Sequence, residues 1–225
     1  MSQQRIAILS RIRASLAARG IIPDEHAVDA RITACAHNLI PARGQLAGDA
    51  LVTQFMQFAL KTQASIATVS SAQDVPRAVG DYLTAGGLSG PVRLSGDGWL
   101  GGMPWDGIAH FNPCTGAVQE TDGAGVSVAL CGIAETATLM LISGANAASG
   151  LNFLPPTHVI VLRATDIVGA LEDGWARLRQ SSNGQMPRTV NLITGPSRTA
   201  DIAQTMYMGA HGPKRLHVIV VQGDA

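Results

Sequence analysis

Apolar residues recur at helical spacing in several stretches of the chain. Ile8, Ile12 and Leu16 are four residues apart and Gly20 follows them, a pattern typical of an amphipathic helix that ends at a glycine. Similar spacing predicts further helices over residues 46–61, 71–85, 165–178 and 199–208, with a helical turn over 133–135. Residues 21–44 lack such a period, so we expect a loosely packed connection there.

Short apolar runs without polar alternation lie between these helices. We expect strands over residues 66–69, 92–94, 108–111, 126–128, 139–142, 158–162, 190–193 and 216–221. Continuous apolar strands that alternate with helices are typical of a parallel sheet covered on both faces. The sequence therefore predicts an α/β domain with a mostly parallel sheet at residues 62–225. A helical N-terminal segment, residues 1–61, is expected to pack on it.

Composition excludes several classes of protein. Of the 225 residues, 46% are hydrophobic and 14% are charged, which is the opposite of the balance in disordered chains. Sixteen basic residues match sixteen acidic ones, so nucleic-acid binding has no electrostatic support. No apolar stretch approaches the roughly 20 residues that span a bilayer, and the N-terminus lacks the apolar segment of a secretory signal. We therefore expect a cytoplasmic protein.

Residues 1–20 carry four arginines and no acidic residue. Mitochondrial transit peptides share this composition. The amphipathic helix expected here accounts for the same residues, and we favour that interpretation. Removal of the segment in a mature form stays an alternative.

The cysteines and histidines form no metal-ligand pattern. Cys35, Cys114 and Cys131 contain no C-x-x-C pair, and the six histidines never fall at metal-ligand spacing. We expect three reduced thiols and no cofactor bound by this chain. The P-loop, the dinucleotide-binding glycine fingerprint and the G-x-S-x-G turn are also missing from the sequence.

The loop at residues 194–199 is the first candidate site. Ligands of open parallel sheets gather beyond the carboxyl ends of the strands, and this loop leaves a predicted strand and opens a predicted helix. Free N–H groups at Gly195 and beyond can hold an anion, Ser197 or Thr199 adds a hydroxyl, and Arg198 suits carboxylate or phosphate. Alternatively, Ser197 or Thr199 only caps the helix, with Asp201 in its first turn.

Glu135 is the candidate catalytic residue. It lies beside Thr136 and Thr138, between apolar residues on both sides. Glutamate is rarely buried without a partner, so either neighbouring N–H groups bind this carboxylate or it has a chemical task.

Two further loops are expected in the same neighbourhood. The loop at residues 143–150 is rich in small residues and starts with Ser143, so it either admits a ligand or is a plain turn. His211 and Gly212 lie in a turn before the last predicted strand. His211 can serve as an acid, a base or a hydrogen-bond donor, or its ring is satisfied by the backbone.

Several motifs occur in the order and spacing of one protein family. The segments are IAETATL at residues 133–139, LPPTH at 154–158, GPSRTADI at 195–202 and HGP at 211–213. They resemble the I-A-E-T-G-T-L, L-P-x-x-H, G-P-S-R-T-A-D-I and H-G-P motifs of the LUD-domain lactate-utilisation protein C (LutC/YkgG) family. Residues 7–13 are similar to the family's first helix. Two departures are Ala137, where the family has glycine, and Ala203, where an acidic residue often stands.

The resemblance implies both a fold and a function. The fold is that of the NagB/RpiA/CoA-transferase-like group. The implied function is that of an accessory subunit in the oxidation of L-lactate to pyruvate, beside partner subunits that carry iron–sulfur clusters, with a small anionic ligand. The alternative is an independent enzyme of the same fold that acts on a sugar phosphate or acyl-CoA. In that case Glu135 is the base or nucleophile and Arg198 holds the substrate.

Overall fold

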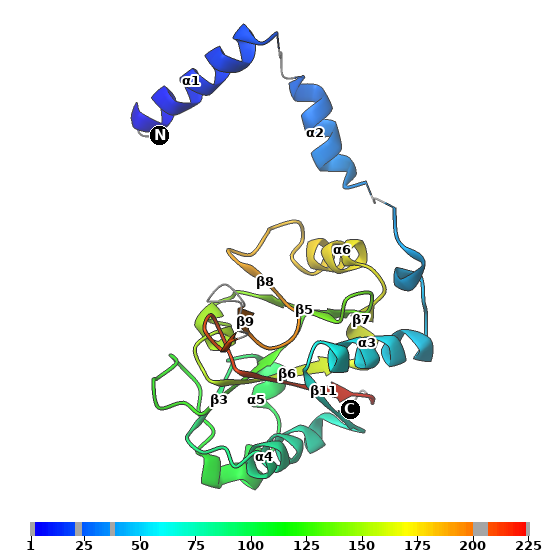
Figure 1. Cartoon of the computed structure of the whole chain (residues 1–225), viewed down its shortest axis with the longest axis vertical. Helices are drawn as coiled ribbons and strands as arrows, with labels where there is room; N and C mark the ends of the chain where they lie inside the picture. The colour runs from blue at the N-terminus through cyan, green and yellow to red at the C-terminus, as the bar shows by residue number, and fades with distance from the viewer. Residues whose placement is uncertain (1–2, 21–23, 37–38, 200–206, 224–225) are drawn as a thin grey trace. The chain divides into compact units, whose positions relative to one another are not determined.

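The computed structural model describes residues 3–20, 24–36, 39–199 and 207–223 (Figure 1). The chain divides into two units, Met1–Leu39 and Ile40–Ala225. The predicted division into a segment at 1–61 packed on a domain at 62–225 stays a prediction. The helix α3 (Asp49–Lys61) belongs to the second unit.

In the described part of the first unit, residues 3–20, 24–36 and 39, two helices bury none of their residues. Helix α1 (Gln3–Ala18) confirms the first predicted helix, and Gly20 follows it with φ of 69°. Helix α2 (Glu25–Ala34) lies where a loose connection was predicted, so that prediction is wrong for these residues. Its start is fixed by Asp24, whose carboxylate accepts a hydrogen bond from the Ala27 amide at 3.0 Å.

A five-stranded parallel sheet organises the second unit. Its strands are β1 (Ser65–Val69), β2 (Val92–Leu94), β3 (Ala124–Val128), β6 (Thr157–Arg163) and β11 (Arg215–Val221). They lie in the order β1-β11-β6-β3-β2, and every pair is parallel. This central sheet confirms the predicted mostly parallel α/β fold.

A second sheet packs on one face of the central sheet and was not predicted as separate. Strands β7 (Ile167–Val168), β4 (Cys131–Ile133), β5 (Thr138–Ile142) and β8 (Val190–Ile193) lie in that order. The pairs β4–β5 and β5–β8 are antiparallel, and β4–β7 is parallel. Residues 134–137 form the turn between β4 and β5, so the helical turn predicted over 133–135 is wrong.

Three apolar cores separate the layers of the second unit. On β6, Val159 faces the core under helix α4 (Val75–Ala85), and its neighbour Ile160 faces the second sheet. On β5, Leu139 faces the central sheet, and Met140 faces helix α6 (Leu171–Ser181). Helices α4 and α6 thus lie on opposite sides of the stacked sheets (Figure 1). Both faces of these strands are buried, which explains their unbroken apolar sequence.

Helices α3 and α4 form as their apolar spacing predicts. Phe55 and Ala59 are the buried residues of α3, and α4 buries its apolar stripe under the central sheet. Gly80 of α4 contacts Ile108 so closely that a Cβ atom would lie 2.4 Å from the Ile108 side chain. Ile108 belongs to the 3-10 helix η3 (Trp105–Phe111), which follows the short helix α5 (Gly98–Gly101), so the strand predicted over 108–111 is wrong.

Two predicted helices differ in the structure. The 3-10 turn η5 (Ala164–Asp166) and β7 precede α6, which therefore begins at Leu171 rather than after Thr165. The helix predicted over 199–208 is wrong at both ends, because β9 (Arg198–Thr199) pairs antiparallel with β10 (Tyr207–Met208). Residues 200–206 of that prediction lie outside the described residues. The remaining short turns are η1 (Ala42–Gly44), η2 (Ala72–Asp74) and η4 (Ser149–Asn152).

Candidate functional site

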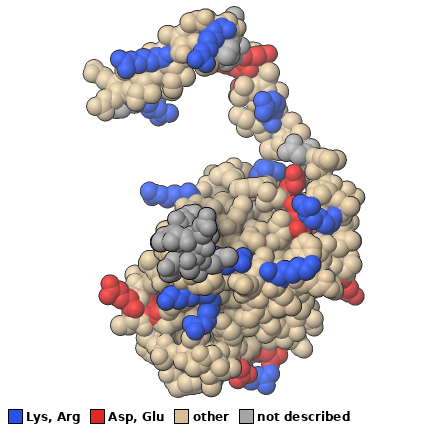
Figure 2. All heavy atoms as spheres, viewed as in Figure 1, with Lys and Arg blue, Asp and Glu red and all other residues tan. Residues whose placement is uncertain are grey.

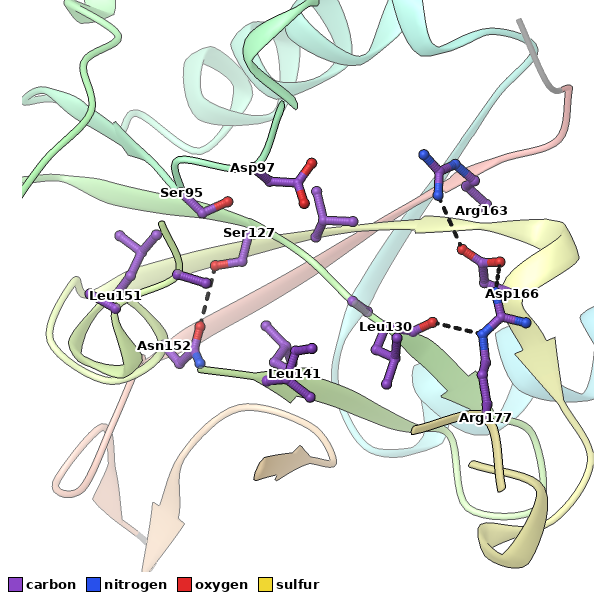
Figure 3. A pocket seen from close by; sticks show the side chains of 15 residues that line it. Ser95, Asp97, Ser127, Leu130, Leu141, Leu151, Asn152, Arg163, Asp166 and Arg177 are labelled. Atoms are coloured by element: carbon purple, nitrogen blue, oxygen red, sulfur yellow. Dashed lines mark hydrogen bonds and ion pairs between the residues drawn. The ribbon is translucent and has the colours of Figure 1, made fainter. Parts of the chain in front are cut away.

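A pocket of about 230 Å³ opens at the carboxyl edge of the central sheet (Figure 3). Its lining includes Ser95 after β2, Ser127 on β3 and Arg163 at the end of β6. Leu141 of β5 lines it from the second sheet, and Arg177 lines it from α6. Ligands of parallel α/β proteins bind at this edge of the sheet, which makes the pocket the first candidate site.

Two arginines and one aspartate form a charged cluster at one end of the pocket. Asp166 lies at the end of η5 and is almost fully buried. It accepts a short hydrogen bond from Arg177, and Nη1 of Arg163 lies 3.5 Å from its Oδ2. Arg177 also donates from Nε to the Leu130 carbonyl at 3.2 Å, and Arg163 lies 3.8 Å above the Trp99 ring. Both guanidinium groups are therefore held in place before any ligand binds.

A serine, an asparagine and a histidine form a hydrogen-bonded chain at the other end. Ser127 donates to Oδ1 of Asn152 at 3.3 Å and lies 3.0 Å from Nε2 of His158. A serine hydroxyl carries one proton, so Nε2 of His158 must donate to Ser127. Burial lowers the pKa of His158 to about 3, which keeps the ring neutral. The Ser127 proton thus points to Asn152, and His158 is not placed to remove it.

Two further polar groups face the same space. The Ser95 hydroxyl is buried and has no hydrogen-bond partner among the described residues. Asp97 accepts hydrogen bonds at Oδ1 from the amides of Trp99 and Leu100, which starts α5 and leaves its Oδ2 without a described partner. Figure 3 shows Ser95 and Asp97 on the same wall, across from the asparagine of the hydrogen-bonded chain.

Glu135, the predicted catalytic residue, lies outside this pocket. Its Oε1 accepts a hydrogen bond from the Leu171 amide, at the start of α6, at 3.0 Å. Its Oε2 lies 3.9 Å from Nε of Arg43. These contacts match the prediction that neighbouring N–H groups bind the carboxylate, and they leave its catalytic role a prediction.

The predicted threonines join two loops of the second sheet. The hydroxyl of Thr138 lies 2.8 Å from that of Thr136 and 2.7 Å from that of Thr194. The turn between β4 and β5 is thereby tied to the loop after β8. Ala137 completes this turn with φ of 53°, the left-handed conformation that favours the glycine found in the family motif.

The loops at residues 195–199 and 209–213 lie together at the amino edge of the central sheet. The Ser197 amide donates to the Pro213 carbonyl at 2.9 Å, and the Ser197 hydroxyl accepts from the His211 amide at 3.2 Å. Gly195, with φ of 73°, approaches the carbonyl of Thr62, just before β1, so closely that a side chain would collide with it. These loops are therefore at the opposite edge of the sheet from the pocket.

The remaining predicted site residues are split between the two edges. Arg198 donates to Oε1 of Gln63 at 3.4 Å, and Gly212 packs beside Ser197. Thr199 is buried in β9, so the helix start that was expected to hold an anion is absent at this position. Ser143 lines a hollow of about 330 Å³ next to the pocket, and its hydroxyl accepts from the Thr189 amide. Asp201 lies outside the described residues.

The sequence interpretation missed the charged cluster and the polar chain of the pocket. Arg163 and Ser127 are polar residues at the carboxyl ends of apolar strands, a signal that was available in the sequence. Asp166 and Arg177 carried no such signal, because the turn before β7 and the later start of α6 bring them together only in the folded chain.

Metal-binding and membrane-spanning features were sought in the described part of the chain. No group of three or more His, Cys, Asp or Glu side chains there could hold a metal ion. No helix there is long and apolar enough to cross a membrane. Lysines and arginines on the visible face lie in separate small groups among neutral residues (Figure 2). The expectations of no bound cofactor and of a cytoplasmic location stay predictions.

The stacked sheets and the pocket at the carboxyl edge define an α/β protein of a known fold. The described chain is similar to the crystal structure of a DUF162 family protein from Deinococcus radiodurans, with a TM-score of 0.60 and 24% identity. The similarity covers 78% of this chain and 99% of that one. The family model described as LUD domain matches residues 119–221, from just before β3 to the end of β11.

Curated relatives agree with this match. An uncharacterized protein of Neisseria meningitidis is 40% identical over 45% of this chain and 43% of its own length. Lactate utilization protein C of Geobacillus kaustophilus is 31% identical, over 49% of each chain. The protein of that name from Bacillus subtilis is 31% identical over 45% of this chain and 43% of its own length. The matches thus span about half the length of these relatives. Residues 119–221 therefore match the LUD domain, and about half of the chain is similar to proteins named lactate utilization protein C.

Proposed function

We propose that the chain is an accessory subunit in L-lactate utilisation. In this role it assists iron–sulfur partner subunits that oxidise L-lactate to pyruvate, and it binds a small anionic ligand. The observation that carries the proposal is the similarity to proteins named lactate utilization protein C. The family motifs at residues 133–139 and 195–202 lie within the matched region and support it.

The contacts of the candidate catalytic groups support an accessory role rather than independent catalysis. The Ser127 hydroxyl donates its proton to Asn152, so it does not form a nucleophile–base pair with His158. The Glu135 carboxylate binds the first amide of α6. In this proposal the electrons of lactate pass to the clusters of the partner subunits, and this chain contributes binding and assembly.

The test is the rate of L-lactate-dependent dye reduction by the iron–sulfur subunits, measured with and without this chain. We expect the rate to depend on the chain and the chain to co-purify with at least one subunit under mild conditions. Glu135→Gln and Arg198→Gln then locate the dependence, with Arg188→Gln as the exposed control. An unchanged rate together with no association would contradict the proposal.

The alternative of an independent enzyme stays a prediction. It requires that Glu135→Gln abolish turnover of a sugar phosphate or acyl-CoA while the fold is kept. The described contacts of Glu135 are explained by its hydrogen bond to α6, so no observation favours this alternative.

A further inference from the structure

We propose that the pocket at the carboxyl edge of the central sheet binds a small monocarboxylate with an oxygen on the neighbouring carbon, that is, a 2-hydroxy or 2-oxo acid. The pocket is lined by Ala147 and Ala148 of the loop at residues 143–150, which was predicted to admit a ligand or to be a plain turn. None of the side chains that were singled out from the sequence lines it, and Ser143 lines the hollow beside it. The binding site is argued from its side chains alone. The choice of 2-hydroxy and 2-oxo acids among small carboxylates rests also on the proposed function.

The charge at one end of the pocket suits a single carboxylate. At this end Arg163 and Arg177 share one carboxylate, that of Asp166, which leaves one positive charge in excess there. Asp97, which lies on the wall with Ser95, brings the formal charge of the whole lining to zero. Nη1 of Arg177 and Nη2 of Arg163 have no partner among the described residues, and a guanidinium group binds a carboxylate through two parallel hydrogen bonds. A phosphate dianion would exceed the free charge and face Asp166 and Asp97.

The other end of the pocket has hydrogen-bonding capacity that the protein does not use. The Ser95 hydroxyl is buried without a partner, and Nδ2 of Asn152 donates to no residue that the structure describes. An unpaired buried hydroxyl is unfavourable, and most buried polar groups in native proteins have partners. A ligand hydroxyl or carbonyl oxygen would accept from Ser95 or Asn152.

The size and the apolar walls limit the rest of the ligand. A volume of about 230 Å³ corresponds to roughly seven waters at ~30 Å³ each, which suits an acid of a few carbon atoms. Leu130 and Leu141 line the pocket between its charged and hydroxyl ends, where the carbon atoms of the ligand would lie (Figure 3). A nucleotide or acyl-CoA would extend beyond this volume.

Calorimetric titration of the full chain tests the ligand class. The probes are sodium L-lactate and pyruvate, with propionate as the match that lacks the second oxygen and inorganic phosphate as the competing anion. We expect L-lactate or pyruvate to bind at least about fivefold more tightly than propionate, since one neutral hydrogen bond is lost. Phosphate should bind more weakly than either. Tighter binding of phosphate, or no binding of any carboxylate, would overturn the proposal.

Pocket variants test the location of the site. Arg163→Gln and Arg177→Gln should weaken all three carboxylates by roughly tenfold or more, since each removes a charge-assisted contact. Ser95→Ala should weaken L-lactate and pyruvate but not propionate. Arg179→Gln on the same helix and Ser89→Ala are the controls. If Arg177→Gln does not fold, the other two variants decide, and unchanged affinities in both would reject the site.

Measuring carboxylate binding by this chain and lactate oxidation by the partner subunits distinguishes this inference from the proposed function. A chain that supports lactate oxidation but binds no carboxylate would reject the pocket ligand alone. A chain that binds L-lactate through Arg163 but has no effect on the partner subunits would reject the accessory role alone.

Discussion

Asp122 is a carboxylate whose side chain has no exposed surface. Nε and Nη2 of Arg93 donate to its two oxygens at 2.9 Å, and the Gln119 amide donates at 2.8 Å. Burial alone would raise the pKa of Asp122, but the hydrogen bonds from Arg93 and Gln119 outweigh burial and lower it. The ionised pair therefore ties β2 to the loop that precedes β3.

Replacing Asp122 by asparagine should destabilise the protein strongly. The substitution leaves the Arg93 charge buried without a counter-charge and turns an NH2 donor toward one of its N–H groups, so that one amide oxygen and the Thr115 carbonyl remain as acceptors. Breaking a buried pair in this way costs about 3–5 kcal/mol. Urea unfolding measures the loss, and Asp81→Asn on the exposed surface of α4 should change the free energy of unfolding by less than about 0.5 kcal/mol. Equal effects of the two variants would contradict the assigned role of the pair.

The cysteines should differ in their reaction with a thiol reagent. Cys131 is buried on β4, and burial raises the pKa of its thiol to about 11. Cys35 is exposed at the end of α2. The thiolate is the reacting form, so we expect Cys35 to react with a chromogenic disulfide in the folded protein and Cys131 only after unfolding. Peptide mass mapping after a short exposure distinguishes them, and early labelling of Cys131 would be the contrary result.

At the scale of elements, helix α6 is started by two carboxylates from different parts of the chain. Asp173 accepts from the Ala170 amide at 2.9 Å, and Glu135 accepts from the Leu171 amide at 3.0 Å. Ala170 has no polar side chain that could cap the helix, so Glu135 supplies the missing acceptor from the turn between β4 and β5. Both carboxylates also lie favourably at the positive end of the helix dipole.

Loss of the Glu135 carboxylate should therefore weaken the fold modestly. Glu135→Ala should lower the free energy of unfolding by about 1–2 kcal/mol, the range measured for helix caps. Glu135→Gln keeps an acceptor oxygen and should cost about 0.3–1 kcal/mol, the dipole contribution. Denaturant unfolding checks both, and Glu172→Gln, in the first turn of α6, is the comparison that loses the dipole contribution alone. An Ala variant as stable as the wild type would mean that the hydrogen bond does not stabilise the helix.

Elements with a repeated local pattern could be predicted from the sequence. Helix α4 has apolar residues at helical spacing and ends at Gly86, and β6 and β11 are apolar along nearly all their length. The structure confirms all three. The local sequence pattern determines these elements because the helix buries a continuous apolar stripe and each strand buries both of its faces.

Elements decided by distant contacts could not be predicted in this way. Residues 108–111 are a short, mostly apolar run like that of a strand, but Ile108 packs against Gly80 of α4 within a 3-10 helix. The turn at residues 134–137 looks helical until β4 and β5 pair across it. The pocket was still harder to predict from the sequence, because Arg163 and Arg177 lie on different elements and are brought together by their contacts with Asp166. The hydrogen-bonded threonines were partly predictable, in contrast, because Thr136 and Thr138 both lie in the family motif at residues 133–139.

At the scale of the whole molecule, two histidines lie buried in neighbouring strands of the central sheet. His158 is on β6 and His217 on β11, where its ring stacks on Tyr82 at 3.9 Å and its Nδ1 lies 2.8 Å from the Ser65 hydroxyl. Burial lowers the pKa of His158 to about 3 and that of His217 to about 4, from 6.5. Both rings are neutral in the folded protein at neutral pH.

Stability should therefore fall as the pH drops below about 6.5. Between pH 6.5 and about 4 the unfolded chain binds protons at both histidines that the folded chain does not bind. Each histidine lowers the free energy of unfolding by up to roughly 1.4 kcal/mol per pH unit in this window. The Asp122–Arg93 pair loses its contribution to the free energy of unfolding only near and below pH 3.8, the ordinary pKa of an aspartate, because the pKa of Asp122 in the folded protein is lower still.

Urea unfolding at pH 7, 6 and 5 measures this slope. His217→Phe keeps a ring against Tyr82 and removes one titrating group, so its slope should be about half that of the wild type. His26→Gln, at an exposed position of α2, is the matched control and should leave the slope unchanged. A free energy of unfolding that stays constant between pH 7 and 5 would contradict the prediction.

The position of β11 in the central sheet sets an order for assembly during synthesis. This strand lies between β1 and β6, and Ser65 of β1 pairs with His217 of β11 across about 150 residues of chain. The ribosome makes residues 1–214 before β11, so β1 has no strand to pair with during this time. Strands β2, β3 and β6 can already pair with one another. Closure of the sheet is thus the last event, and pairing over such a separation is slow. A nascent chain stalled before residue 215 would expose the open edges of β1 and β6, which makes it a natural target for chaperones and proteases.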